Sequence, residues 1–241
     1  MNVSVTGPKI IFQLPFGIHI TETVVNMWIV MALLTLLSLW LTRNLKVRNP
    51  GKRQLAAEKI YLMLTGLVKG TMGKEQSFFV TYICALFGMS MFGSLMGLIG
   101  LRPPTADLST TLGFALVSFV LTQTVKIKSG GFLGFLKSFT EPVAVITPLN
   151  IISEVASPIS MAFRHFGNIA SGVVISALIY GALAALSNAV LGWLPNSFLA
   201  SVPWLMAGLP AVLSLYFDVF TSFLQAYIIC MLTMVFATDS E

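Results

Sequence analysis

A single arginine stands inside a long apolar stretch of this sequence. Between Arg164 and Asp218 the chain has no charged residue, and before Arg164 the nearest one is Glu154. A guanidinium stays protonated in any protein environment, and placing one in hydrocarbon costs about 2.5 to 3.5 kcal/mol on insertion scales. A fixed charge kept at that cost is a candidate for function by default.

Small and polar residues continue the helical face that Arg164 begins. They are Gly167, Asn168, Ser171 and Gly172. Spaced in this way, they form a narrow polar face that a partner could approach closely. Two structural alternatives remain open, because Arg164 could instead snorkel to the membrane surface or pair with Glu154.

A second polar face is spaced for helical alignment near the end of the chain. Its members are Asp218, Thr221, Ser222 and Gln225, at i, i+3, i+4 and i+7. Hydroxyl groups in membrane helices commonly form hydrogen bonds to neighbouring helices, which is the simpler explanation for Thr221 and Ser222 taken singly. Asp218 has no such explanation, and a carboxylate there could take up and release a proton.

The elements that carry these residues are predicted to be membrane helices. The chain has 241 residues, of which 56% are hydrophobic and 10% charged, and a mean hydropathy of +0.88. A spanning helix needs about 20 apolar residues. Five stretches meet this requirement, at 22–42, 76–101, 108–125, 143–191 and 203–238. The sequence therefore predicts an all-α integral membrane protein, a single domain over 1–241, with its last two helices long and tilted.

The positions of Lys and Arg predict the orientation, since loops on the cytoplasmic side carry the excess of positive charge. Most of the basic residues lie in the loop 43–75 and around Lys126 to Lys137. The N-terminal segment 1–21 is then outside and the C-terminus inside. Apolar and charged residues over Arg53 to Met72 suit an amphipathic helix on the cytoplasmic surface, and a solvated basic loop is the alternative.

The long fourth stretch, 143–191, is charged only at Glu154 and Arg164. We expect one strongly tilted helix, preceded by a segment that Pro142, Pro148 and Pro158 mark.

Several function classes are excluded by what the sequence lacks. It has no Gly-rich phosphate loop, no CxxC and no HExxH motif, and His19 and His165 are too few and too far apart for a metal site. No basic stripe with interleaved aromatic residues indicates nucleic-acid binding, although the net charge is +5. We therefore expect no cofactor, no metal, and chemistry that takes place within the membrane.

Three motifs carry a family resemblance. The stretch Pro158 to Gly172 reads PISMAFRHFGNIASG and resembles the arginine-bearing helix of subunit a of F-type ATP synthases. Leu224 to Tyr227, LQAY, is similar to that family's L-Q-A-[FY] motif, and Pro104 to Thr111, PTADLSTT, to its outer-loop motif. The motifs occur in the family's order, and the resemblance covers nearly the whole chain.

The resemblance implies an ion-translocating stator that is not catalytic by itself. Its partners would be a rotating ring of c subunits, the peripheral-stalk b subunits and the remaining ATP synthase subunits, in the lipid bilayer of a bacterial inner membrane. Arg164 would face the ring between two half-channels that load and unload H⁺ or Na⁺. Asn168 and Gln225 match polar positions along the path, and Ser171 and Ser222 are further candidates for its lining.

The sequence departs from the family pattern at four positions. Many members pair a glutamate on the arginine helix with a histidine or polar residue on the last helix, and here these positions hold Val173 and Asp218. The outer half-channel would thus keep one ionisable group, on the last helix. His165 replaces a usual leucine, and Ser94 stands where an asparagine is common.

A secondary ion-coupled transporter is the alternative function. It would use Arg164 and Asp218 as a site at the bilayer midplane. Such folds usually contain inverted repeats, and the sequence has no convincing repeat.

Overall fold

The structure of the chain is a computed structural model that describes residues 7–13, 15, 19–48, 50–73, 77–140, 143–191 and 215–238. Several predictions fall wholly or partly outside these residues. They concern parts of the N-terminal segment 1–21 and of the loop 43–75, Gln76 at the start of the second span, Pro142, and 203–214, the first part of the predicted last span.

Five helices in the described residues are long and apolar enough to cross a membrane. They are α1 (Glu22–Thr42), α3 (Ser77–Leu95), α4 (Leu108–Ser138), α5 (Thr147–Leu191) and α8 (Thr221–Thr238). The 3₁₀ turn η1 (Met96–Ile99) prolongs α3, and the π-helical turn η4 (Leu215–Phe220) precedes α8. Each of the five helices overlaps one of the predicted stretches, because an apolar segment in lipid satisfies its backbone polar groups only within a helix. The all-α membrane fold is confirmed.

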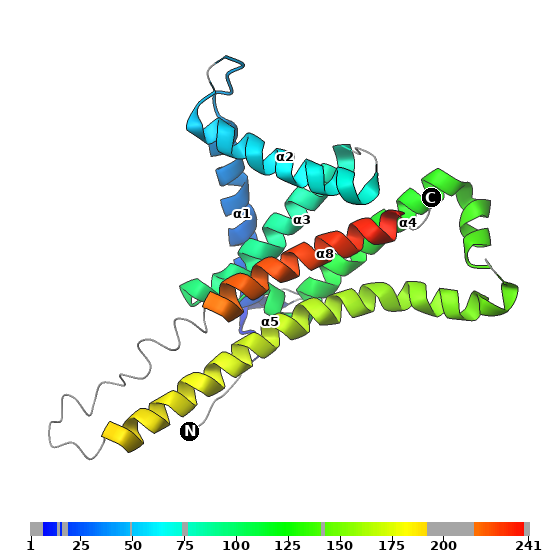
Figure 1. Cartoon of the computed structure of the whole chain (residues 1–241). Coiled ribbons are helices and arrows are strands. Elements are labelled where there is room, and N and C mark those ends of the chain that lie inside the picture. Colours follow the sequence, from blue (N-terminus) through cyan, green and yellow to red (C-terminus); the bar gives the residue numbers. More distant parts are fainter. Residues whose placement is uncertain are drawn as a thin grey trace.

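Helix α5 is the longest element, with 45 residues. At 1.5 Å per residue it is roughly 68 Å long, about twice the thickness of a hydrocarbon core. Figure 1 shows α5 and α8 strongly inclined to α1. The predicted tilt follows from this length, since an upright helix of this size would extend far beyond the membrane.

The prediction that three prolines precede α5 is wrong for two of them. Pro148 is the second residue of α5, and Pro158 lies inside it. Proline is tolerated in the first turn, where its missing N–H would have no partner. In the interior it removes a hydrogen bond to the carbonyl of Glu154, and neighbouring helices compensate for such losses in membranes. Pro158 is buried, which is consistent with packing of this kind.

Helix α4 continues past the predicted span end at residue 125 and bends at Gly131. The φ of Gly131 is 70°, a left-handed value that glycine adopts without steric cost. Beyond Gly131 the chain turns back through the 3₁₀ turn η3 (Ala144–Ile146) into α5. Figure 1 shows this turn projecting from the bundle at the right.

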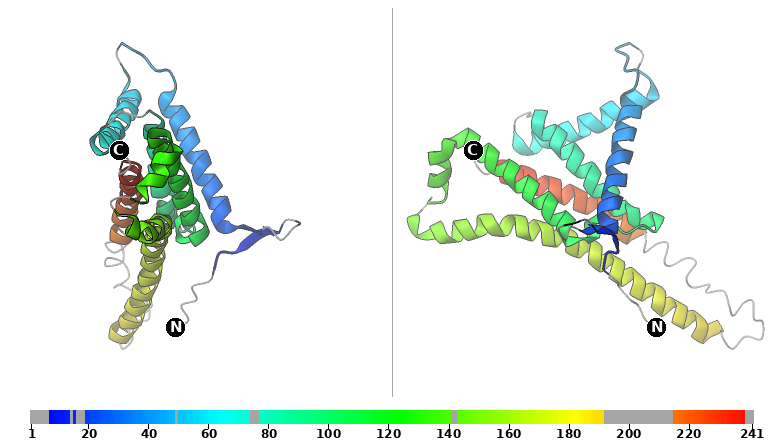
Figure 2. Two further views of the ribbon diagram at one scale, coloured as in Figure 1. Left: turned by 90° about the vertical axis from the view of Figure 1, so that its right-hand side faces the viewer. Right: turned by 180° about the vertical axis from the view of Figure 1, so that it is seen from behind.

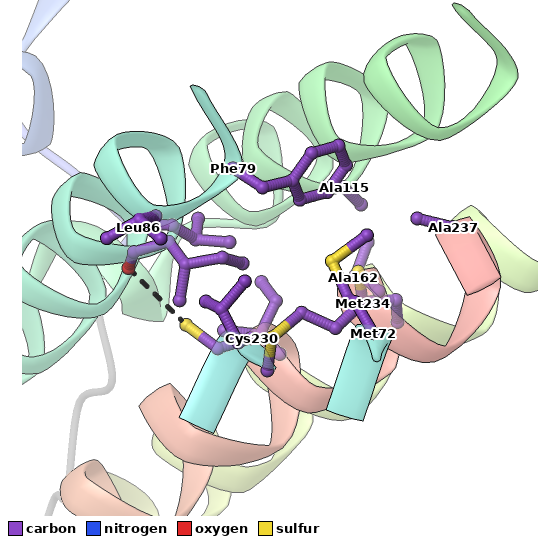
Figure 3. Packing of buried hydrophobic residues seen from close by; sticks show 13 residues of the cluster. Met72, Phe79, Leu86, Ala115, Ala162, Cys230, Met234 and Ala237 are labelled. Carbon is purple, nitrogen blue, oxygen red and sulfur yellow. Dashed lines mark hydrogen bonds between the residues drawn. The ribbon is translucent and has the colours of Figure 1, made fainter. Parts of the chain in front are cut away.

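The core lies where α3, α4, α5 and α8 meet. Figure 3 shows its residues, with Phe79 and Leu86 from α3, Ala115 from α4, Ala162 from α5, and Cys230 and Met234 from α8. The Sγ of Cys230 lies 3.8 Å from the carbonyl oxygen of Ile83, to which it donates a weak hydrogen bond. Small residues such as Ala115 and Ala162 allow the helices to approach closely.

Helix α2 (Lys52–Met72) lies across one end of the bundle, which we call the α2 end (Figure 1). Its buried residues Leu64, Thr65, Val68 and Met72 all belong to its second half. Gly73, with a left-handed φ of 69°, ends the helix by donating to the carbonyl of Lys69. The predicted helix over Arg53 to Met72 is therefore present, and its position on the membrane surface stays a prediction.

The opposite end carries a short hairpin, β1 (Ile10–Gln13) and β2 (His19–Thr21), which the sequence did not predict. Figure 2 shows it projecting beside the foot of α1. At this hairpin end the turn η2 (Pro104–Ala106) leads to Asp107, whose carboxylate accepts from the backbone N–H of Ser109 and caps α4. Thr23 on α1 donates to the same carboxylate at 2.9 Å. Through Asp107, the predicted outer-loop motif Pro104 to Thr111 thus links the start of α1 to the start of α4 by hydrogen bonds.

Candidate functional site around Arg164

Arg164 lies on an exposed face of α5. It belongs to a stripe of small or polar exposed residues, which includes Ser153, Ala156, Ser160, Asn168 and Ser171. Within the described part of the chain, its guanidinium forms no hydrogen bond and no ion pair. A Cβ added at Gly167 would meet nothing within 4 Å, so this face is open. The stripe leaves room for a partner surface against the charge.

Glu154, the alternative counter-ion for Arg164, is engaged elsewhere. Its Oε1 lies 2.9 Å from Nζ of Lys126 on α4, and the Nε2 of Gln123 donates to the same oxygen. Only 27% of the Glu154 side chain and 17% of the Lys126 side chain are exposed. This ion pair holds α4 to α5, and it leaves the charge of Arg164 without a carboxylate from Glu154.

A cavity of about 190 Å³ opens beside Arg164 on its N-terminal side. We call it the serine cavity. Its lining includes Ser153, Ser157, Ser160 and Arg164 from α5, and Leu232 and Phe236 from α8. Hydroxyl groups and a guanidinium make one side of this cavity polar, while apolar side chains line the rest, and its volume exceeds what several water molecules need.

A larger open cleft, of about 930 Å³, begins on the C-terminal side of Arg164. We call it the Asp218 cleft. Its lining includes Glu22 from α1, Arg102 and Asp107 from the hairpin end, Tyr180 from α5, Asp218 from η4 and Ser222 from α8. Several ionisable groups therefore border one space that reaches from the hairpin end to the last helix.

A hydrogen bond joins α5 to α8 one turn beyond Arg164. Nδ2 of Asn168 donates to Oε1 of Gln225 at 3.1 Å. Along α8 the Asp218 cleft reaches Ser222, and the serine cavity begins at Leu232, so Gln225 lies between the two spaces. Along α5 the lining of the serine cavity ends at Arg164 and that of the cleft begins at Phe166.

Asp218 lies in the π-helical turn η4 and is half-buried. The hydroxyl of Thr221 donates to the carbonyl oxygen of Tyr216 at 3.1 Å, a side-chain bond within the turn. Turns of this kind are frequent at functional sites. Asp218 and Ser222 border the same cleft, as their predicted common face requires.

The other predicted site residues divide into two groups. Gln225 and Ser222 are both 1% exposed, and they point from α8 into the bundle. Ser171 is exposed, and its hydroxyl donates to the carbonyl of Asn168 on its own helix. Of the departures from the family pattern, Val173 and Ser94 both line the Asp218 cleft.

His165 is fully buried and belongs to a different side of α5 from Arg164. Its Nε2 lies 3.3 Å from Oγ of Ser90 on α3. Adjacent residues of a helix point about 100° apart, which explains how one faces the core and the other the open stripe.

Sequence reasoning missed the serines before Arg164 and the charged residues at the hairpin end. Ser153, Ser157, Ser160 and Arg164 follow the spacing i, i+4, i+7 and i+11, a signal that was available in the sequence. Glu22, Arg102 and Asp107 carried no such signal, because they come together only through the packing of α1 against the loop. Within the described residues, no group of three His, Cys, Asp or Glu side chains could hold a metal ion.

Comparison with known proteins gives consistent similarities. A family model described as ATP synthase A chain matches residues 24–238. The ATP synthase subunit a of Desulforamulus reducens is 34% identical over 90% of this chain and 78% of its own length. A subunit from Propionigenium modestum, named ATP synthase subunit a, sodium ion specific, is 30% identical over 98% of this chain and 86% of its own. The ATP synthase subunit a 1 of Hahella chejuensis is 31% identical over 100% of this chain and 92% of its own.

Proposed function

This chain belongs to the ATP synthase A chain family, and from that premise we propose that Arg164 separates two half-channels of its ion path. Ions would enter through one half-channel, ride on a rotating ring of c subunits, and leave through the other. The chain would be the stator of this path and would catalyse no reaction by itself.

One observation carries the proposal. On α5 the serine cavity extends from Ser153 to Arg164, whereas the Asp218 cleft begins at Phe166 and continues toward the C-terminal end of the helix. On α8, Gln225 lies between Ser222 of the cleft and Leu232 of the cavity. A continuous channel would let ions cross without turning the ring. Two separate spaces, with Arg164 at the end of one of them, would instead oblige a cation to leave the stator before it can reach the other side.

The exposure of Arg164 supports its role toward the ring. The guanidinium has no counter-charge within the described residues, so it can attract a ring carboxylate that has lost its ion. The small residues of the α5 stripe would let a ring helix approach closely. Each charge moved across the membrane gains about 2.3 kcal/mol per 100 mV, and this energy would contribute to the drive for rotation.

Asp218 is proposed as the ionisable group of the outer half-channel. It lines the larger cleft together with Val173, the position where many family members carry a glutamate. A carboxylate on η4 can serve this space from the facing side, and Ser222 would add a hydroxyl to the same lining.

The proposed orientation has the α2 end inside and the hairpin end outside, in a bacterial inner membrane. The basic loop between α1 and α2 supports it, because positive residues favour the cytoplasmic side. The b subunits of the peripheral stalk and the remaining ATP synthase subunits complete the proposed set of partners. The transported cation is H⁺ or Na⁺, and measuring whether ATP synthesis requires Na⁺ would decide between them.

Thiol labelling from each side of the membrane tests the two half-channels. In a variant that lacks Cys84 and Cys230, one new cysteine is placed in the cleft (Val173→Cys) or in the cavity (Ser160→Cys). Sealed vesicles of either orientation, holding the whole complex, are treated with a thiol reagent that does not cross membranes. We expect Val173→Cys to react only from outside and Ser160→Cys only from inside.

Labelling of both cysteines from one side would contradict separate half-channels, and a swapped pattern would contradict only the orientation. A secondary transporter, in contrast, would move ions without a ring. Ion flux through the purified chain alone, in vesicles that contain no c subunits, would favour that alternative.

A further inference from the structure

The corner between α1 and α2 carries the densest positive charge in the sequence. Its exposed basic residues, which we call the basic corner, are Arg43, Lys46, Arg48, Lys52 and Arg53. No acidic residue occurs between them. The next acidic residue along the chain is Glu58, whose carboxylate accepts a hydrogen bond from Gln54 at 2.7 Å. Among the described residues, none of the five basic side chains forms an ion pair.

Two contacts give the corner a defined shape. Gln54 exchanges hydrogen bonds with the backbone of Lys46, accepting at 2.8 Å and donating at 3.0 Å, which closes the loop onto the start of α2. The guanidinium carbon of Arg53 lies 4.3 Å from the ring centre of Trp40, on the last turn of α1. The second contact fixes a positive charge at the level where the apolar helix ends, and tryptophan prefers that level of a membrane.

Apolar side chains surround the corner and are equally exposed. The second half of α1 has no buried residue, since those of α1 are Thr23, Asn26 and Val30. In α2, five large apolar side chains that precede its first buried residue are at least half exposed, namely Leu55, Ile60, Tyr61, Leu62 and Met63. A polar protein segment would satisfy the charges but would offer no apolar surface to these side chains. A lipid satisfies both, with a phosphate for the charges and acyl chains for the apolar side chains.

We propose that the basic corner binds the phosphate headgroups of anionic lipids in the leaflet at the α2 end. Trp40 and the apolar side chains of α2 then lie against the acyl chains of the same lipids. Because the buried residues of α2 all lie in its second half, the bound lipids would help to hold its first half and the end of α1 in place. The inference uses the proposed orientation only to identify this leaflet as the inner one, and it does not depend on the ion path.

Quenching of Trp40 fluorescence by brominated lipids tests the proposal. The full chain, with Trp28, Trp193 and Trp204 changed to Phe, is reconstituted in vesicles that contain brominated phosphatidylglycerol or brominated phosphatidylcholine. We expect stronger quenching by the anionic lipid. The excess should fall in Arg43→Gln/Arg53→Gln, since the loss of two charges lowers the affinity for an anionic headgroup about 30-fold.

The matched control is Lys69→Gln/Lys128→Gln, which removes two exposed basic residues away from the corner. It should keep the full excess. Equal quenching by the two lipids, or an unchanged excess in Arg43→Gln/Arg53→Gln, would overturn the proposal. The measurement is repeated on the assembled complex, and the fluorescence of a complex that carries Trp40→Phe is subtracted to leave the signal of Trp40. An excess that is present in the chain alone and absent in the complex would assign the corner to another subunit and would also overturn it.

Discussion

Asn168 on α5 donates a hydrogen bond to Gln225 on α8, with 3.1 Å between Nδ2 and Oε1. The two helices carry the two polar faces, and this bond joins them at Gln225, which lies on α8 between the Asp218 cleft and the serine cavity. Gln225 is 1% exposed, whereas Asn168 remains on the open face of α5. The bond therefore links a buried amide to a residue that a partner can touch.

A double-mutant cycle measures what this bond contributes. Asn168→Ala and Gln225→Ala should each slow ATP-driven ion pumping. The double variant should raise the activation free energy for pumping by less than the two single variants raise it together. Removing either partner already breaks the bond, so we expect a coupling energy of about 1 kcal/mol. The control is Ser171→Ala, whose hydroxyl bonds only within α5. Strictly additive effects would show that the bond is not used.

Replacing Asp218 tests the ionisable group of the outer half-channel. Asp218→Asn keeps the shape and removes the ability to take up a proton or hold a cation. We expect ion pumping in vesicles to fall about 100-fold, the scale on which a positioned proton-transfer group contributes, while Asp218→Glu retains part of it.

A second carboxylate in the same cleft provides the control for Asp218. Asp107 caps α4 through Oδ1 and accepts from Thr23 through Oδ2. Asp107→Asn keeps an oxygen acceptor for the cap and places an NH2 group beside the hydroxyl of Thr23, which can accept from it. Pumping in Asp107→Asn should stay close to normal. An equal loss in both variants would mean that the cleft needs negative charge in general and not Asp218 in particular.

The Lys126–Glu154 ion pair is expected to stabilise the protein rather than translocate ions. Lys126→Met leaves a largely buried carboxylate with Gln123 as its remaining donor, which should cost about 1.5 to 3 kcal/mol. The midpoint of thermal unfolding measures this loss of stability. The double variant Lys126→Glu/Glu154→Lys, in which the two charges are exchanged, should recover most of the lost stability. Lys128→Met, at an exposed position, is the control. A Glu154→Gln variant that loses pumping as completely as an Arg164 variant would assign Glu154 to the ion path instead.

His165→Leu is expected to leave ion pumping and its pH dependence unchanged. The imidazole is fully buried toward α3, 3.3 Å from Oγ of Ser90, and leucine has a similar volume. A histidine in the ion path would be recognised by its titration near neutral pH. The measurement is the pumping rate of both proteins over that range. A pH profile that moves on substitution would show that His165 takes part in translocation.

The sequence was sufficient to predict the helices and the two polar faces. Long apolar stretches have one stable backbone form in a membrane, and polar residues at helical spacing must share a face. Arg164, Asp218 and Gln225 could be selected as candidate site residues for this reason, and their roles stay predictions. Their mutual arrangement could not, because it depends on how α5 and α8 cross.

Contacts between distant residues were beyond sequence reasoning for the same reason. Nothing local indicates that Glu154 meets Lys126 on α4 or that Thr23 meets Asp107. The prolines of α5 were misread because proline breaks helices in water, whereas neighbouring helices can support Pro158 within a membrane. The short β1–β2 hairpin gave too brief a pattern to be recognised.

The central claim is that the charge of Arg164 couples ion movement to rotation, and its removal tests this most directly. In membranes that hold the whole complex, ATP-driven ion pumping and ATP hydrolysis are measured side by side in Arg164→Ala and in the unchanged protein. We predict that Arg164→Ala abolishes pumping while hydrolysis by the detached catalytic head survives. Normal pumping in that variant would contradict the account.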